Sequence, residues 1–174
     1  MDNYEELVSL AKKDNPDAFT ELFGMVNKDL YRFAFYTLKN AHDAEDVVSD
    51  TILDAYESIK RLRKESSFRS WIFMILSNKC KRKLKQYVNK SMPLDDNLAA
   101  VTRDLGEEYD VRNAFSQLTA EERLIVSMQV FGGYNSKEIG KILNINANTI
   151  RSKHHRALIK MEQLLNDSDQ KGVI

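Results

Sequence analysis

Residues 42–86 contain two consecutive amphipathic segments of opposite charge, and they constrain the fold more than any other part of the chain. Over residues 42–59, apolar side chains recur at spacings of three and four, which places them on one face of a helix. Acidic residues follow the same spacing on another face: Asp43, Asp46, Asp50, Asp54 and Glu57. A second helix starts at Phe68 and ends in the basic run Lys79–Lys85. These two faces indicate that the chain binds a protein with one surface and nucleic acid with the other.

The 174 residues have a formal net charge of zero, but the charges are grouped in blocks. Counting Lys and Arg against Asp and Glu gives −8 over residues 1–59, +10 over 60–90, −6 over 91–122 and +4 over 123–174. Separated basic zones are what extended contact with DNA requires.

Export and membrane insertion are not expected. No apolar stretch approaches the roughly 20 residues of a membrane span, and no signal peptide opens the chain. The single cysteine, Cys80, excludes an intramolecular disulfide and suits a reducing compartment. We therefore expect a cytoplasmic protein that is not inserted directly into a membrane.

The apolar pattern predicts an all-α protein made of two small helical domains. Before Asn40 it predicts three helices, over residues 4–13, from 17 to about 26, and 30–38, followed by the helices of residues 42–59 and 68–86. The apolar pattern then fades in an acidic segment, which we interpret as a flexible linker. The expected division is a first domain over residues 1–87, a linker over 88–112, a second domain over 113–166 and a frayed tail over 167–174.

The second domain follows the pattern of a helix-turn-helix. Two helices are predicted to begin at capping-box pairs, which are Thr119 with Glu122 and Asn135 with Glu138. A short turn at residues 144–146 precedes a longer helix whose start is rich in polar and basic side chains. The side chains expected to face a DNA major groove are Asn148, Thr149, Arg151, Ser152, Lys153, His155 and Arg156. A plain helical hairpin is the alternative interpretation.

These motifs resemble those of the extracytoplasmic-function (ECF) sigma factors of bacterial RNA polymerase. Residues 43–48 (DAEDVV) resemble the family's region 2.2, and residues 65–72 (ESSFRSWI) resemble the start of its region 2.3. Residues 118–165 resemble sigma domain 4, notably Glu138-Ile139, residues 148–152 and residues 155–157. The resemblance extends over nearly all of residues 5–166.

The resemblance implies a role for each motif. Asp43, Asp46, Asp50 and Asp54 would dock on the coiled coil of the polymerase β′ subunit, and domain 4 would meet the β flap. The loop of residues 62–67, between the two helices, would hold a base flipped from the promoter −10 element. Its contact residues would be Leu62, Arg63, Lys64, Ser66 and Ser67, supported by Trp71 and Asn78. Lys79, Arg82 and Lys83 would contact nearby DNA backbone, and the groove-facing set of domain 4 would contact the −35 element. An anti-sigma factor is the implied inhibitor, and neither a cofactor nor a metal is implied.

Three residues depart from the family pattern. Leu62 stands where an aromatic residue is common, which would weaken base stacking. Arg82 takes a position that is often acidic in the family, and an arginine there would raise the affinity for DNA phosphate. His154 occupies a usually aliphatic site in the recognition helix, and we interpret it as a partly buried histidine that does not bind metal with His155.

Two other function classes compete with a sigma factor. A stand-alone helix-turn-helix regulator would use the N-terminal helices to dimerise or to sense a ligand, but it would not need an acidic face followed by an aromatic and basic segment. An enzyme using Asp43, Asp46 and Asp50 is disfavoured, because solvated acidic helix faces look the same. We therefore expect a non-enzymatic transcription initiation factor.

Overall fold

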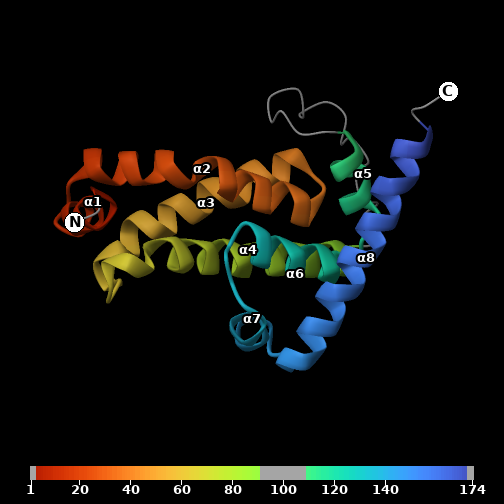
Figure 1. The fold of residues 1–174 in the computed structure, drawn as a ribbon. Helices are drawn as coiled ribbons and strands as arrows, with labels where there is room; N and C mark the ends of the chain where they lie inside the picture. Colours follow the sequence, from red (N-terminus) through yellow and green to blue (C-terminus); the bar gives the residue numbers. More distant parts are fainter. Residues whose placement is uncertain (1–2, 91–108, 172–174) are drawn as a thin grey trace.

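The computed structural model describes residues 3–90 and 109–171, and every regular element within them is helical. The first group of helices is α1 (Asn3–Ala11), α2 (Pro16–Leu38), α3 (Ala41–Ser58) and α4 (Phe68–Lys90). The second group is α5 (Tyr109–Ser116), α6 (Ala120–Val130), α7 (Ser136–Leu143) and α8 (Ala147–Lys171), as Figure 1 shows. The predicted all-α fold with two helical domains is confirmed.

Helix α2 corrects one prediction. The apolar pattern predicts two helices over residues 17–38, but the structure has a single continuous helix of 23 residues. It begins after Asn15, whose side chain accepts a hydrogen bond from the Ala18 N–H at 3.0 Å. The polar residues 27–29 do not interrupt the helix, because Val26 and Leu30 are four residues apart and both lie in the core. The helix ends at Leu38, and the residue that caps it, Lys39, lies in the left-handed region at φ 57°.

The first domain has its core where α2 packs against α1, α3 and α4. Its buried side chains include large aromatic residues, and Phe33 meets Phe73 edge to face with ring centroids 5.8 Å apart. Between α3 and α4 the chain forms two short 3-10 turns, η1 (Ile59–Arg61) and η2 (Glu65–Ser67). This core holds the charged faces of α3 and α4 in a fixed arrangement.

The second domain places α8 against α5, α6 and α7. The short helix α5 occupies the last residues of the expected linker, and α4 continues into its first residues. The rest of that linker, with its expected flexibility, lies outside the described residues. The expected frayed tail is partly wrong, because α8 continues to Lys171.

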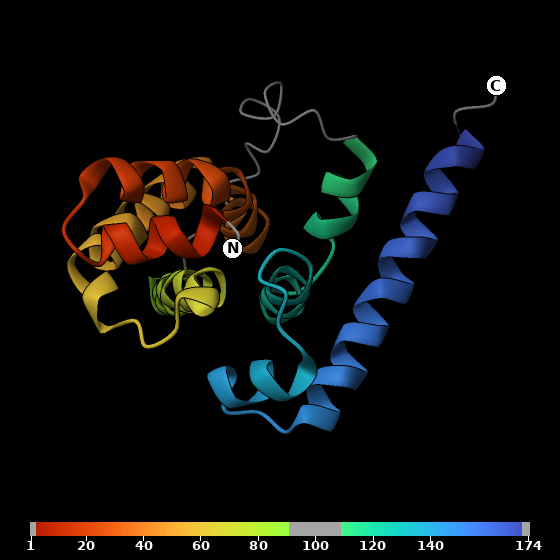
Figure 2. The same ribbon diagram turned by 60° about the vertical axis from the view of Figure 1, so that its left-hand side comes forward.

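The two domains share an interface. Helix α6 of the second domain packs against α2 and α4 of the first, and α5 also contacts α2. Helix α6 overlaps α4 in Figure 1, and Figure 2 shows α6 between α4 and α8. The sequence did not indicate this contact, because it suggested two domains separated by a linker.

Candidate protein-binding and nucleic-acid-binding surfaces

The predicted docking carboxylates of α3 differ in exposure and in pairing, and Asp54 is both exposed and paired. Asp46 and Asp50 are exposed, and Asp46 lies 3.2 Å from Nδ1 of the exposed His42. Asp43 instead forms an ion pair with Lys83 at 2.7 Å, and Asp54 forms one with Lys79 at 2.7 Å. Two of the four predicted docking carboxylates therefore already hold α4 against α3.

Asp43 is the more enclosed of the two paired carboxylates, because the Tyr87 hydroxyl also donates to it. Burial acts to raise the pKa of Asp43, but the hydrogen bonds from Lys83 and Tyr87 outweigh burial and hold the pKa below its ordinary value. Asp43 is therefore a charged anchor between α3 and α4 at neutral pH.

Asp43 also belongs to a group with His42 and Asp46 whose ligand atoms lie within 4.8 Å of one another. His42 is exposed and Asp43 is already paired with Lys83 and Tyr87. An ion-pair network accounts for this arrangement without a metal.

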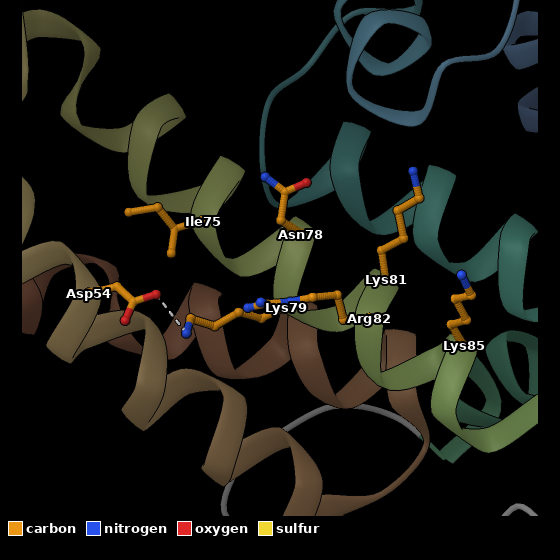
Figure 3. A pocket seen from close by; sticks show the side chains of 7 residues that line it. All are labelled: Asp54, Ile75, Asn78, Lys79, Lys81, Arg82 and Lys85. Carbon is orange, nitrogen blue, oxygen red and sulfur yellow. Dashed lines mark ion pairs between the residues drawn. The ribbon is translucent and has the colours of Figure 1, made fainter. Parts of the chain in front are cut away.

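Helix α4 presents its basic residues on two sides. Lys79 has only 10% of its side chain exposed and reaches Asp54 of α3, as Figure 3 shows. Asn78, Lys81 and Lys85 recur at spacings of three and four and project away from Asp54 (Figure 3). Together with Asp54, Ile75 and Arg82 they line an open pocket of about 550 Å³. Arg82 also lines a second pocket, which contains Asp46 and Asp50.

This arrangement changes the set of basic residues that nucleic acid can reach. The predicted phosphate contacts are Lys79, Arg82 and Lys83, but Lys79 and Lys83 are engaged with α3. Lys81 and Lys85 belong to the basic run predicted to bind nucleic acid but were not named among its contact residues, and both are exposed. Their spacing from Asn78 places them on one helix face, and that signal was available in the sequence.

The segment of residues 62–71 is held in place on both sides. Leu62 is 7% exposed and belongs to the hydrophobic core, so it offers no surface for a base in this structure. Glu65 forms an ion pair with Lys12, in the turn after α1, at 2.6 Å, and this hydrogen bond lowers the pKa of Glu65. The predicted contact residues around them remain accessible: Arg63, Lys64 and Ser66 are exposed, while Ser67 and Trp71 are half-buried.

The helix-turn-helix of α7 and α8 forms as predicted, with both predicted capping boxes present in the domain. Asn144 ends α7 in the left-handed region at φ 58°, and Ile145 N–H donates to Gly140 O at 2.9 Å. The Asn146 side chain then accepts from Asn148 N–H at 2.8 Å, at the start of α8. The turn therefore holds the start of α8 against α7.

Most of the predicted groove-facing set lies on the exposed side of α8: Asn148, Thr149, Arg151, Ser152, His155 and Arg156. Lys153 differs, because it is half-buried and forms an ion pair with Glu121 of α6. Arg151 lines a small pocket with Asn135, Ser136 and Lys137 at the start of α7. Lys137 was missed by sequence reasoning, although a lysine in the first turn of the preceding helix is a recognisable signal.

His154 is half-buried on α8, in agreement with its interpretation as a partly buried histidine. Burial, followed by the charge of His155, lowers the pKa of His154. The neutral form of His154 is therefore favoured in the folded protein.

The Gly140→Ala substitution is expected to destabilise the helix-turn-helix by about 1–3 kcal/mol, the usual cost of overpacking. A Cβ at this position would lie 2.6 Å from the Ile145 carbonyl oxygen, which is backbone and cannot rotate away. Urea denaturation of the full chain measures the change. Gly24→Ala is the matched control, because nothing lies within 4 Å of a Cβ there. Equal stability of the two variants would contradict the close packing at Gly140.

Two family models match the chain in the order of its domains. The model for sigma-70 region 2 matches residues 22–89, and the model for sigma-70 region 4 matches residues 109–161. The first match contains the charged faces of α3 and α4, and the second contains the helix-turn-helix. The chain therefore belongs to the sigma-70 family.

The curated relatives narrow this assignment to the ECF group. The chain is 27% identical over 151 residues to the ECF RNA polymerase sigma factor SigM of Mycobacterium tuberculosis, covering 85% of this chain and 77% of the relative. It is also 27% identical over 145 residues to the RNA polymerase sigma factor SigV of Bacillus subtilis, covering 82% of this chain and 87% of the relative. The protein is an ECF-type RNA polymerase sigma factor, and sigma factors are non-enzymatic initiation factors.

Two solved structures share the fold. CnrH in complex with the cytosolic domain of CnrY superposes with a TM-score of 0.66 at 21% identity, covering 95% of this chain and 99% of CnrH. The sigma factor RpoE of Bartonella quintana, in complex with the anti-sigma factor NepR, superposes with a TM-score of 0.69 at 21% identity, covering 85% of this chain and 96% of RpoE. Within residues 3–90 and 109–171, no helix combines the length and apolar character needed to cross a bilayer.

Proposed function

We propose that this sigma factor docks on core RNA polymerase through the exposed carboxylates of α3 and directs initiation at promoters with −10 and −35 elements. One observation carries this proposal. The two regions that match the sigma-70 models bear an exposed acidic face and two separate exposed basic faces. Asp46 and Asp50 are the primary docking residues, because they are exposed and make no ion pair with α4, whereas Asp43 and Asp54 pair with Lys83 and Lys79 of α4.

The −10 contact is assigned to the start and the outer face of α4. Ser66, Ser67 and Trp71 would hold an unstacked base, with Arg63 and Lys64 beside them, because flat rings stack on bases and cations follow phosphates. Asn78, Lys81, Arg82 and Lys85 would follow the strand along the helix. Leu62 is not proposed as a base contact, since it is buried. Lys79 and Lys83 are paired with carboxylates of α3, so they would attract the DNA strand mainly through their positive charge.

The −35 contact is assigned to the exposed side of α8. Arg151, with Asn148, Thr149 and Ser152, would read base edges, because residues at the start of a recognition helix enter the major groove. His155, Arg156 and Lys137 would meet the flanking backbone. Lys153 would orient α8 through Glu121 rather than contact bases.

The remaining partners follow from the family. We propose that domain 4 meets the polymerase β flap, that the protein acts in the cytoplasm, and that an anti-sigma factor holds it inactive. Both structural neighbours described above were solved with a partner, and NepR is an anti-sigma factor. A stand-alone regulator is not favoured, because the region 2 match accounts for the acidic and basic helices of the first domain.

The docking proposal is tested by reversing the two exposed charges. The double variant Asp46→Lys with Asp50→Lys is expected to bind core polymerase about tenfold more weakly or worse, because like charges then face a basic partner surface. Affinity is measured by titrating labelled full-length chain with core polymerase.

The matched control is the double variant Glu5→Lys with Glu6→Lys, which makes the same change in net charge at exposed positions on α1. This control should bind as the wild type does, and circular dichroism should show equal helicity for all three proteins. Equal weakening by both double variants would assign the effect to net charge and refute the docking site on α3.

A further inference from the structure

The base-holding loop (residues 62–67) is tied to one short turn by two ion pairs. This turn, residues 12–14, follows α1 and leads into α2. Lys12 Nζ lies 2.6 Å from Glu65 Oε1, and Lys60 Nζ lies 2.6 Å from Asp14 Oδ1. Lys60 precedes the loop and Glu65 lies within it. The two pairs therefore hold the chain on both sides of residues 63 and 64, which carry exposed cations assigned to the −10 contact.

The turn is itself fixed in place by its backbone. Lys13 N–H and Asn15 N–H both donate to Leu10 O, at 2.9 and 3.2 Å. Asp14 lies in the left-handed region at φ 65°, a conformation that aspartate adopts more readily than most residues. Asn15 then accepts from Ala18 N–H and begins α2. The turn therefore offers Lys12 and Asp14 from a defined position between two helices.

Helix α1 also supports the start of α4 directly. Tyr4 meets the edge of the Phe68 ring, with centroids 6.0 Å apart and planes at 72°. Phe68 is fully buried, and its centroid lies 6.0 Å from that of Trp71, the ring assigned to stacking on an unstacked base. Leu62 anchors the other end of the loop in the core. The loop and the first turn of α4 are thus supported from behind by α1 and the turn that follows it.

The two ion pairs differ in exposure. Lys12 and Glu65 have 22% and 35% of their side chains exposed, whereas Lys60 and Asp14 have 58% and 71%. Solvent and salt screen the more exposed pair more strongly. The pair of Lys12 with Glu65 is therefore the principal attachment, and the pair of Asp14 with Lys60 is the weaker one.

We propose that Lys12 and Asp14 are positioning residues for −10 recognition, which hold the base-holding loop in the conformation that accepts an unstacked base. The inference rests on the proposed function of that loop. Both residues lie before residue 22, where the match to sigma-70 region 2 begins. A loop that is already in its binding conformation loses less conformational entropy when a base enters. The affinity for a correct −10 element therefore depends on side chains that do not touch DNA.

The test measures −10 discrimination by holoenzyme assembled from core polymerase and the full chain. A promoter is first selected from a random-sequence library with the wild-type holoenzyme. Its affinity is then compared with that of a template altered only at −10, and the ratio of the two affinities is the discrimination. The ratio cancels any change in general attraction between the variant and DNA. Urea denaturation of each free chain measures stability separately.

Lys12→Glu is expected to lower the discrimination about fivefold, the most that a partly exposed ion pair usually contributes. The double variant Lys12→Glu with Glu65→Lys should restore most of it, because it forms the pair again with the charges exchanged. Lys13→Glu is the matched control, since it makes the same charge change at an exposed position in the same turn and should keep the wild-type ratio. Asp14→Asn keeps a residue suited to the left-handed region, and it should cause a smaller loss.

A wild-type ratio for Lys12→Glu would overturn the proposal, even if that variant were less stable in urea, because the pair would then support only the fold. An equal loss for Lys13→Glu, or no recovery in the exchanged double variant, would overturn it as well. If Lys12→Glu loses helicity, Lys12→Met decides the test, because it keeps the aliphatic stem and removes only the charge. Failure of the proposed function has a separate signature, since the wild-type holoenzyme would then not distinguish the two templates.

Discussion

Arg123→Ala is expected to lower the free energy of unfolding by about 3 kcal/mol, within the range for breaking a buried polar network. Arg123 is 2% exposed, and its guanidinium serves two carbonyls, Thr37 O at 3.1 Å and Leu118 O at 2.7 Å. The substitution leaves both carbonyls without this donor and removes the packing of the aliphatic stem. Because Thr37 and Leu118 belong to different domains, unfolding should also become less cooperative.

Urea denaturation of the full chain, followed by circular dichroism, measures both effects. Arg63→Ala is the control, because Arg63 is exposed and substitutions of that kind usually change stability by less than about 0.5 kcal/mol. Arg123→Lys retains the charge but cannot reproduce the planar fork, so its stability should lie between those of the wild type and the alanine variant. A loss for Arg123→Ala no larger than that of the control would show that the buried guanidinium contributes nothing to stability.

Arg151→Ala is expected to cost about 1–3 kcal/mol of promoter binding by the holoenzyme, the usual discrimination of a bidentate base contact. Arg151 is exposed on α8, and its Nη1 donates to Asn148 Oδ1 at 3.0 Å, which orients the guanidinium at the start of the helix. The loss should depend on the −35 sequence. It is measured on templates that differ only at −35.

Arg82→Ala is the companion variant for this test. Arg82 is exposed on α4, so its expected contact is with phosphate, and its removal should weaken open-complex formation at all templates alike. The log-salt slope should fall by about 0.7 if the phosphate belongs to a single strand. If Arg151→Ala weakens every template equally, α8 binds the backbone there without reading bases.

The helices and their ends could be predicted because their causes are local. The capping boxes of Thr119 with Glu122 and of Asn135 with Glu138 span three residues, and both form as predicted. The apolar spacing of residues 42–59 likewise predicts the buried face of α3. The error in α2 is also local, since polar residues on an outer face interrupt an apolar pattern without interrupting the helix.

The site residues were predicted less completely, because exposure depends on partners that are distant in the sequence. Residue type and helical position place Arg151 and Arg156 on an exposed side of α8, as predicted. Lys83 and Lys81 are both lysines of the same basic run. Lys83 is paired with Asp43, whereas Lys81 is exposed. Leu62 was assigned to the base-holding loop by resemblance, but it belongs to the hydrophobic core and is buried.

The sequence by itself therefore determined the helical fold, the helix-turn-helix and the separation of charge between α3 and α4, since periodicity and capping act within one or two helical turns. Only the tertiary structure decided which charges are paired and how the domains meet. Tyr36 and Phe115, or Arg123 and Thr37, lie in different domains, and no local spacing links them. Their contacts depend on the packing of α5 and α6 against α2, which places side chains distant in the sequence within a few ångströms of each other.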